Sequence, residues 1–279
     1  MRTFKEVAHE SYENVCYETK SKVAQRQFWQ SLEDYVHPHI GDVPVDKVRN
    51  EDIITIANAI VKNRRTNEVG PFKIVLAETA RKTMGRVSIV FARAIALGLR
   101  GPSDNPTKLV KEGRLLRIKK PKTKHHRSLH WSEMAKFWNA LSERTGASAD
   151  LTRFILLTGC RLTEARLAKW SEYDEENALL KVPAERMKNE DDHEKVLSKQ
   201  AVEVLELRKQ TYTDSEYIFV QETTRKPLSD NALSALHKRM GYYNLLTTHG
   251  FRSSMTDYFA EHDIPHEIAK LTLSHKHLN

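Results

Sequence analysis

The first hundred residues alternate apolar and polar positions with the period of amphipathic helices. Apolar residues recur three or four positions apart over about residues 4–15, 23–36, 51–63 and 73–99. Pro38 and Gly41 end the second of these stretches, and Asn50 is a suitable N-cap for the third. Four amphipathic helices of this length predict a small helical bundle.

The second half of the chain mixes two kinds of pattern. Helical spacing covers about residues 132–143, 148–158, 162–168, 200–210, 229–240, 247–261 and 265–273. Short apolar or alternating runs predict two strands joined by a charged turn, at 178–182 and 193–197, and a further short strand at 217–220. We therefore expect a mainly α-helical protein whose second domain holds a small antiparallel β-sheet.

Between the two halves, proline and glycine interrupt the helical spacing. Gly101 and Pro102 end the last helix of the first half, and Pro106 and Pro121 disfavour another helix before the second half. The expected organisation is two domains joined by a linker, at residues 1–100, 101–127 and 128–279.

The linker, together with Arg100 directly before it, also carries a charge equal to the whole net charge of the chain. Between Arg100 and Arg127 ten lysines and arginines face two acidic residues, which equals the +8 of all 279 residues. A concentrated basic segment suggests a strand that lies along phosphates, whereas a solvated, self-repelling linker is the simpler alternative. The candidate DNA contacts are Lys119, Lys120, Lys122, Lys124 and Arg127.

Composition excludes several classes of protein. Charged residues make up 29% of the chain, no apolar run is long enough for a membrane helix, and the first ten residues do not read as a signal peptide. The two cysteines, Cys16 and Cys160, are far apart, so neither a disulfide framework nor a zinc site is indicated. A protein of a reducing compartment fits these features.

Four short segments carry residues suited to phosphate chemistry. Arg161 directly follows an apolar helix that ends at Gly159, and Glu164 lies three residues further on, where it can pair with the guanidinium. His249 and Arg252 fall three apart on the first turn of a predicted helix, where free amides attract an anion. Taken alone, the first is most simply an ion pair and the second a chance spacing.

The other two segments are equally weak when they are read singly. Lys188 lies in the charged turn between the two predicted strands, where a lysine is usually only solvated. His275 follows the last predicted helix, where a histidine is more often a cap than a catalyst.

The order of the four segments is far more specific than any one of them. Arginine, a hairpin lysine, His-x-x-Arg and a histidine at a helix end resemble the tyrosine recombinase (phage integrase) family. The surrounding sequences TGCRLTEARLAKW, PAERMK, THGFRSSMTDYF and LSHKH are similar to integrases of prophages and genomic islands. The resemblance covers the second domain, and the helical first domain with its basic linker is similar to the family's core-DNA-binding domain.

The resemblance implies the tyrosine recombinase fold and a DNA strand-exchange reaction. In this family a tyrosine hydroxyl attacks the scissile phosphate and forms a 3′-phosphotyrosine, which retains the energy of the broken bond, so no metal or other cofactor is expected. The resemblance assigns phosphate binding to Arg161 and Arg252, whose planar guanidinium groups match the non-bridging oxygens of the phosphate. Glu164 is then a supporting residue that positions Arg161.

The remaining roles also follow from the resemblance. Lys188 corresponds to the general acid that protonates the leaving 5′-oxygen, His249 to a residue that assists proton transfer, and His275 to a hydrogen-bond donor to the phosphate. The acidic residues of the turn after Lys188 are unfavourable beside a phosphate.

The nucleophile itself is expected outside this chain. In similar integrases it lies about ten residues after the position of His275, at about position 285, whereas the sequence ends at Asn279. Tyr258 is better explained by packing, and Tyr242 and Tyr243 precede the His-x-x-Arg helix. The chain is therefore expected to bind DNA without cleaving it. An N-terminal arm-binding domain, common in such integrases, is also not recognised.

Partners and alternatives complete the sequence-based hypothesis. We expect double-stranded attachment sites as substrate, a homotetramer on DNA, a monomer without DNA, possible DNA-bending accessory proteins, and the cytoplasm of a bacterial or phage-infected cell. One alternative is a naturally shortened protein that binds attachment sites without cutting. Another takes 256–273 as a helix-turn-helix of a regulator, which leaves Arg161, Lys188 and the His–Arg pair unexplained.

Overall fold

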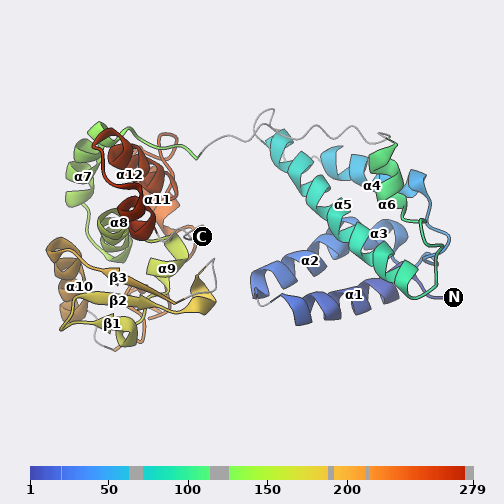
Figure 1. Ribbon diagram of the computed structural model, residues 1–279, viewed down its shortest axis with the longest axis horizontal. Helices are drawn as coiled ribbons and strands as arrows, with labels where there is room; N and C mark the ends of the chain where they lie inside the picture. The colour runs from blue at the N-terminus through green and yellow to red at the C-terminus, as the bar shows by residue number, and fades with distance from the viewer. Residues whose placement is uncertain (20, 63–71, 114–125, 188–191, 212–213, 274–279) are drawn as a thin grey trace. The chain divides into compact units, whose positions relative to one another are not determined.

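The computed structural model describes residues 1–19, 21–62, 72–113, 126–187, 192–211 and 214–273, with the side chains of 72–76 excepted. The chain forms two compact units, Met1–Thr123 and Lys124–Asn279 (Figure 1). Within the described residues no helix is long and apolar enough to cross a membrane.

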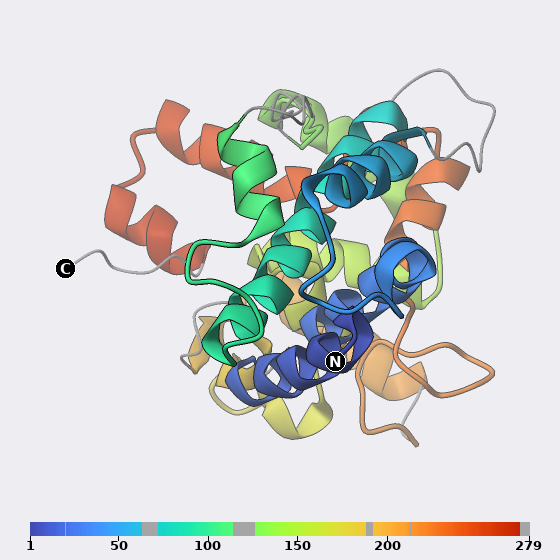
Figure 2. The same cartoon turned by 90° about the vertical axis from the view of Figure 1, so that its right-hand side faces the viewer.

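The N-terminal unit is a bundle of helices around one apolar core. Its helices are α1 (Phe4–Glu18), α2 (Lys22–Tyr35), α3 (His37–Ile40), α4 (Asn50–Lys62), α5 (Phe72–Ala96) and α6 (Pro106–Glu112). The long helix α5 packs against α1, α2, α4 and α6 (Figures 1 and 2). The four helices expected from the apolar spacing are all present, and their buried faces supply Phe4, Leu32, Ile56, Val87 and Phe91 to the core.

Helix α6 corrects the expectation that proline keeps the segment after Gly101 from becoming helical. Asn105 is the N-cap, and its side-chain oxygen accepts hydrogen bonds from the amides of Thr107 and Lys108 at 3.1 and 3.3 Å. Pro106 occupies the first helical position, where the missing N–H costs nothing and the fixed φ suits the helix. Val110 completes the turn by packing into the core of the N-terminal unit.

The C-terminal unit is also mainly helical, with a small antiparallel sheet, so the expected fold class is confirmed. Its elements are α7 (Met134–Ser142), α8 (Ala147–Thr158), α9 (Leu162–Arg166), β1 (Tyr173–Asp174), β2 (Leu179–Val182), β3 (His193–Val196), α10 (Lys199–Thr211), α11 (Ala232–Arg239), α12 (Gly250–Glu261) and α13 (His266–Thr272). Single 3₁₀ turns lie at Trp131–Glu133, Trp170–Glu172 and Ala184–Arg186.

The sheet has the strand order β1-β2-β3, with Leu180 opposite Lys195 in the central pairing. The two strands expected from the sequence are β2 and β3, and β1 adds a third that is only two residues long. The prediction of a strand at 217–220 is wrong. Tyr217 and Val220 form only isolated bridges, because the apolar run between them fills the core instead of pairing along its length.

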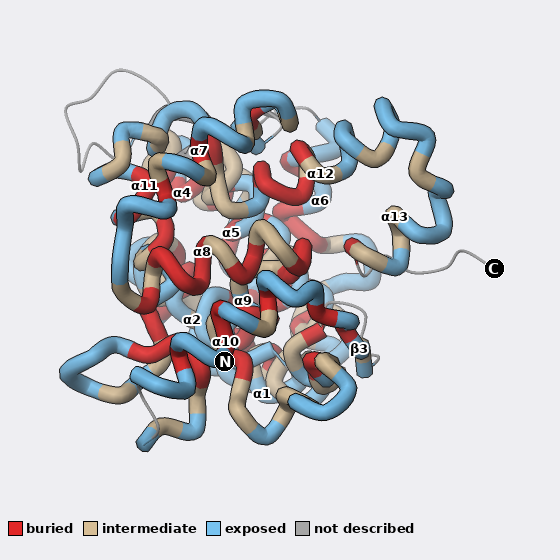
Figure 3. The backbone as a smooth tube through the Cα atoms, turned by 90° about the vertical axis from the view of Figure 1, so that its left-hand side faces the viewer, coloured by how far each residue is buried: buried red, intermediate tan, exposed pale blue. Residues whose placement is uncertain are grey.

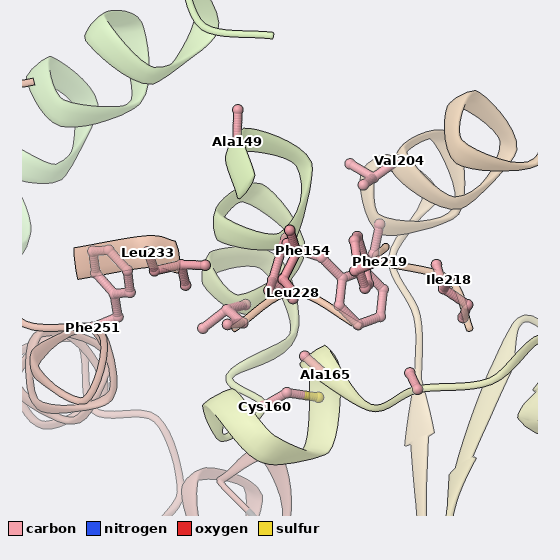
Figure 4. Close-up of a cluster of buried hydrophobic side chains, with 14 of the residues drawn as sticks. Ala149, Phe154, Cys160, Ala165, Val204, Ile218, Phe219, Leu228, Leu233 and Phe251 are labelled. Atoms are coloured by element: carbon pink, nitrogen blue, oxygen red, sulfur yellow. The ribbon is translucent and has the colours of Figure 1, made fainter. Parts of the chain in front are cut away.

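Helix α8 runs through the core of the C-terminal unit. Eight of its twelve residues are buried, and in Figure 3 it is drawn mostly in the colour of buried residues, whereas α13 is not. Phe154 of α8 packs against Phe219 with ring centroids 5.4 Å apart, beside Leu228 (Figure 4). The end of α8 is therefore held rigidly by packing, and so is the turn that follows it, where Cys160 and Ala165 are also buried.

Candidate functional site

The turn after α8 brings three helix ends together. Gly159 ends the helix with a φ of 63°, a left-handed conformation that favours glycine. A Cβ at this position would lie 3.2 Å from both Leu273 Cδ2 and Met255 Sδ, so the end of α13 and the side of α12 pack closely on this turn. The next helix, α9, begins at Leu162, and Arg161, two residues after Gly159, is its N-cap.

Arg161 and Glu164 form the pair expected from their spacing. One carboxylate oxygen of Glu164 accepts from Arg161 Nη1 at 2.6 Å, and the other accepts from the backbone amide of Arg161 at 2.8 Å. The Glu164 side chain is fully buried, whereas 21% of the Arg161 side chain is exposed. The buried carboxylate thus caps α9 and fixes the guanidinium of a side chain that is still partly exposed to solvent.

Arg252 approaches the same turn from the first half of α12. It is buried, and its Nη1 and Nη2 donate hydrogen bonds to the main-chain oxygens of Gly159 and Leu273. Burial, and the nearby positive charge of Arg161, lower the pKa of Arg252 to about 10. The group therefore stays cationic at neutral pH.

Lys195 of β3 is a third cation at this place, and the sequence analysis missed it. Only 5% of the residue is exposed, and Nζ donates to the main-chain oxygens of Thr272 at 2.6 Å and Thr158 at 3.3 Å. Burial lowers the pKa of this ammonium. The signal in the sequence was weak, because a lysine in a short charged strand normally faces solvent.

His193 lies two residues before Lys195, on the same face of β3, and was also missed. Its ring is partly buried, and burial lowers its pKa, as do the positive charges of Lys195, Arg161 and Arg252, which outweigh the opposite effect of Glu164. A neutral imidazole beside three cations is an available proton donor or acceptor.

His249 is the N-cap residue of α12 and is exposed, with its ring centroid 4.4 Å from that of His126. The turn that carries it is held against residues 126–130, which lead into the unit without regular secondary structure. The amide of Thr247 donates to the main-chain oxygen of Arg127 at 2.9 Å, and a Cβ on Gly250 would lie 2.1 Å from that same oxygen. Glycine is required at position 250 by this close approach.

Several predicted site residues lie outside the residues that the structure describes. These are Lys188, His275, Lys119, Lys120, Lys122 and Lys124. Arg127 is described: its Nη1 donates to Asn244 Oδ1 at 3.3 Å, and its guanidinium carbon lies 5.8 Å from the centre of the Tyr243 ring. Arg127 thus already has partners on the surface of its own unit.

The position of Tyr258 is explained by its packing against neighbouring rings. Its ring stacks on His262 with centroids 4.0 Å apart and meets Trp131 edge-on at 5.5 Å. Tyr242 packs against Phe137 at 4.9 Å, and Tyr243 is 46% exposed. Among the described residues, no interaction connects any of these three tyrosines with Arg161, Arg252 or Lys195.

Positive charge exceeds negative charge around the α8 turn in the part of the chain that the structure describes. Among the residues that the structure describes, Arg161, Arg252 and Lys195 gather there, and Glu164 is the carboxylate in their electrostatic range. Cys160 adds no negative charge, because burial raises the pKa of its thiol. No group of three or more metal-ligating side chains occurs among the described residues. The arrangement is suited to binding an anion between preorganised donors.

Comparison with known families agrees with this geometry. Residues 4–112 match the model described as the phage integrase central domain, and residues 123–279 match the model of the phage integrase family. The chain belongs to the phage integrase family. The family expected from the four sequence segments is therefore confirmed.

Among curated relatives, the chain is similar to two prophage integrases of Escherichia coli strain K12. It is 29% identical to prophage integrase IntA over 255 residues, which are 88% of this chain and 56% of that protein. It is 30% identical to prophage integrase IntZ over 233 residues, 83% of this chain and 53% of that protein. The chain thus spans about half the length of these relatives.

Solved structures of integrases share the fold. The chain superposes on a lambda integrase dimer bound to a COC′ core site with a TM-score of 0.72 at 18% identity, covering 99% of this chain and 96% of that one. A lambda integrase tetramer bound to a Holliday junction gives the same TM-score and identity, over 99% and 78% of the two chains. The Tn1549 transposon integrase, in complex with circular intermediate DNA, matches with a TM-score of 0.67 at 13% identity, over 100% and 93%.

Proposed function

We propose that this chain is the core-binding and catalytic part of a site-specific DNA recombinase acting on double-stranded attachment sites. The observation that carries the proposal is the pair of arginines at the α8 turn. Arg161 and Arg252 come from different helices, repel each other electrostatically and face one buried carboxylate. A phosphate of the DNA backbone between them would relieve the repulsion, and its oxygens would accept hydrogen bonds from both planar guanidinium groups.

The chemistry that fits this site is transesterification at phosphorus. A tyrosine hydroxyl attacks the scissile phosphate, the two guanidinium groups stabilise the charge that develops on the non-bridging oxygens, and the 5′-oxygen leaves as a hydroxyl. Lys188 protonates that oxygen, His249 assists proton transfer, and His275 donates a hydrogen bond to the phosphate. These roles are carried over from the family by position.

The attacking tyrosine is expected beyond Asn279, at about position 285, because it must reach the phosphate held by Arg161 and Arg252. Reading the gene past codon 279 is the direct check, since a tyrosine within about a dozen codons supports cleavage, whereas a stop codon supports DNA binding alone. On DNA we expect a homotetramer, assisted by DNA-bending proteins, and without DNA a monomer. The lambda integrase tetramer on a Holliday junction supports this assembly.

The decisive experiment measures covalent protein–DNA adducts on an attachment-site duplex, with the chain extended through the expected tyrosine. Arg252→Ala should abolish the denaturant-resistant adduct while DNA binding stays largely intact, because binding depends on many phosphate contacts and cleavage on this one. Arg239→Ala, an exposed arginine at the end of α11, is the matched control and should cleave normally. Normal cleavage by Arg252→Ala contradicts the site, and an adduct formed by the 279-residue chain itself contradicts the position of the nucleophile.

The basic segment has its own test. Neutralising Lys119, Lys120, Lys122 and Lys124 should weaken binding to duplexes of any sequence and flatten the dependence of log K on log salt, by about 0.9 for each phosphate that the segment no longer neutralises. The measurement is a titration of fluorescent duplex at several salt concentrations. An unchanged slope would show that this segment does not touch phosphates.

A further inference from the structure

Strand β3 buries a charged side chain and exposes an apolar one, the reverse of what burial normally favours. Lys195 is 5% exposed, whereas its neighbour Val196 is 80% exposed. Successive side chains of a strand point to opposite faces, so shifting the strand by one residue would bury the valine and expose the lysine. The observed register keeps the charge inside. Something other than apolar burial therefore fixes Lys195 there.

The ammonium is held by the ends of two helices. Thr158 is the last residue of α8 and Thr272 the last residue of α13, and both of their main-chain oxygens accept from Lys195 Nζ, at 3.3 and 2.6 Å. The last four carbonyls of a helix have no partner within it and carry the negative end of the helix dipole. One buried cation thus joins two helix ends that would otherwise bring like partial charges together.

Arg252 binds the next carbonyl of each helix. Its guanidinium donates to the oxygen of Gly159, the C-cap of α8, and to that of Leu273, the C-cap of α13. The two cations therefore share two consecutive pairs of carbonyls. Any movement of one helix end against the other changes the acceptors of both cations at once.

The packing around these carbonyls is tight. A Cβ on Gly159 would already be 3.2 Å from Leu273 Cδ2 and 3.5 Å from the oxygen of Thr272. A buried ammonium costs several kcal/mol of desolvation, and an apolar side chain of similar length would fill the same space without that cost. Simple stability does not require a charge at position 195.

We propose that Lys195 is a positioning residue for Arg252: its ammonium holds the ends of α8 and α13 at the separation at which the guanidinium binds both C-caps and keeps its orientation. The use of that orientation, binding a DNA phosphate, rests on the proposed function, whereas the positioning itself does not. Lys195 acts through Arg252 and makes no contact with substrate in this role.

The test observes the Arg252 side chain in the free protein. With arginine labelled with ¹⁵N, the Nε–Hε signal of Arg252 is assigned by its loss in Arg252→Lys, and that of Arg153 by its loss in Arg153→Lys. Arg153 is a suitable internal reference, since its guanidinium donates to the Asp150 carboxylate and to the main-chain oxygens of Leu141 and Arg144, away from the ends of α8 and α13. In Lys195→Met the Arg252 signal should move toward that of solvent-exposed arginines or disappear through exchange, while the Arg153 signal stays in place.

Two further variants make the result unambiguous. Lys181→Met changes an exposed lysine on the neighbouring strand β2, which pairs with Asp174 at 3.2 Å, and should leave the Arg252 signal unchanged. Lys195→Gln keeps a donor but cannot reach both carbonyls, and serves if the methionine variant does not fold. An Arg252 signal that is unchanged in a folded Lys195 variant overturns the proposal, as does an equal change in Lys181→Met.

A second arm uses duplex DNA and separates this proposal from the proposed function. Arg252→Ala should reduce the salt slope of binding by about 0.9 in the wild-type background, and by nearly nothing in the Lys195→Met background, because the guanidinium is already displaced there. If Arg252→Ala leaves the wild-type slope unchanged, the phosphate contact of the proposed function is wrong. The spectrum of the free protein still decides the role of Lys195.

Discussion

His237 makes the stability of the C-terminal unit depend on pH. The side chain lies on α11, is 1% exposed, and is enclosed by Phe137 and Phe251, with ring centroids at 5.9 and 5.5 Å. Its Nε2 finds no hydrogen-bond partner among the described residues. Burial alone lowers the pKa of His237 to about 4, so the folded protein holds this ring in its neutral form.

The magnitude follows from the difference between the folded and unfolded states. An unfolded chain protonates histidine with a pKa of about 6.5, and each unit of difference corresponds to about 1.4 kcal/mol. The stabilising contribution is fully present above about pH 6.5 and is lost as the pH falls toward 4, because only the unfolded state then binds the proton. The free energy of unfolding should therefore fall by about 2 kcal/mol between pH 7.5 and 5, and by about 3 kcal/mol in all.

Urea unfolding of wild type and His237→Leu at pH 7.5 and pH 5 measures this contribution. The leucine variant should lose about 2 kcal/mol less than the wild type on acidification, whatever its stability at pH 7.5. His266→Leu, an exposed histidine on α13, is the matched control and should keep the wild-type dependence. Equal losses in wild type and His237→Leu would refute the reasoning, because burial of His237 would then not be linked to folding.

Substitutions at Gly250 and Glu164 test the framework of the site, with Gly85→Ala on α5 as a control. Gly250→Ala should destabilise the protein by about 2 kcal/mol or more, because the added Cβ meets the oxygen of Arg127 at 2.1 Å, whereas Gly85→Ala, where a Cβ meets nothing, should stabilise by about 0.5–1 kcal/mol. Thermal unfolding of both variants compares them, and equal effects would contradict the close approach. Glu164→Gln should cost about 2 kcal/mol, because a buried, charged hydrogen bond to Arg161 is replaced by a neutral one. Wild-type stability in this variant would show that the carboxylate does not hold Arg161.

The fold class followed from the sequence because its evidence is local and periodic. Apolar spacing predicted the long helices, and their positions agree with the structure to within a few residues. Helix α6 did not follow, because Pro106 was read as a breaker although a capped first position tolerates it. Residues 217–220 were predicted as a strand because a short buried apolar run has the same sequence pattern whether or not it pairs with another strand.

The candidate site divides in the same way. The pairing of Arg161 with Glu164 could be expected, since a residue at a helix N-cap and the residue three positions later lie close together. The burial of Lys195 could not, because it depends on helix ends that are distant in the sequence, at Thr158 and Thr272. A buried lysine is recognised only when its acceptors are known.

The segment 126–130, which leads into the C-terminal unit, has a practical consequence for dissecting the protein. The oxygen of Arg127 accepts from the amide of Thr247, and that of Leu129 accepts from the Ser254 hydroxyl. A catalytic fragment cut at the first regular turn, at Trp131, would leave both donors without these acceptors and expose the flank of the His249–Arg252 turn. A fragment meant to fold and bind DNA alone should begin before His126, so that residues 126–130 keep their contacts with Thr247 and Ser254.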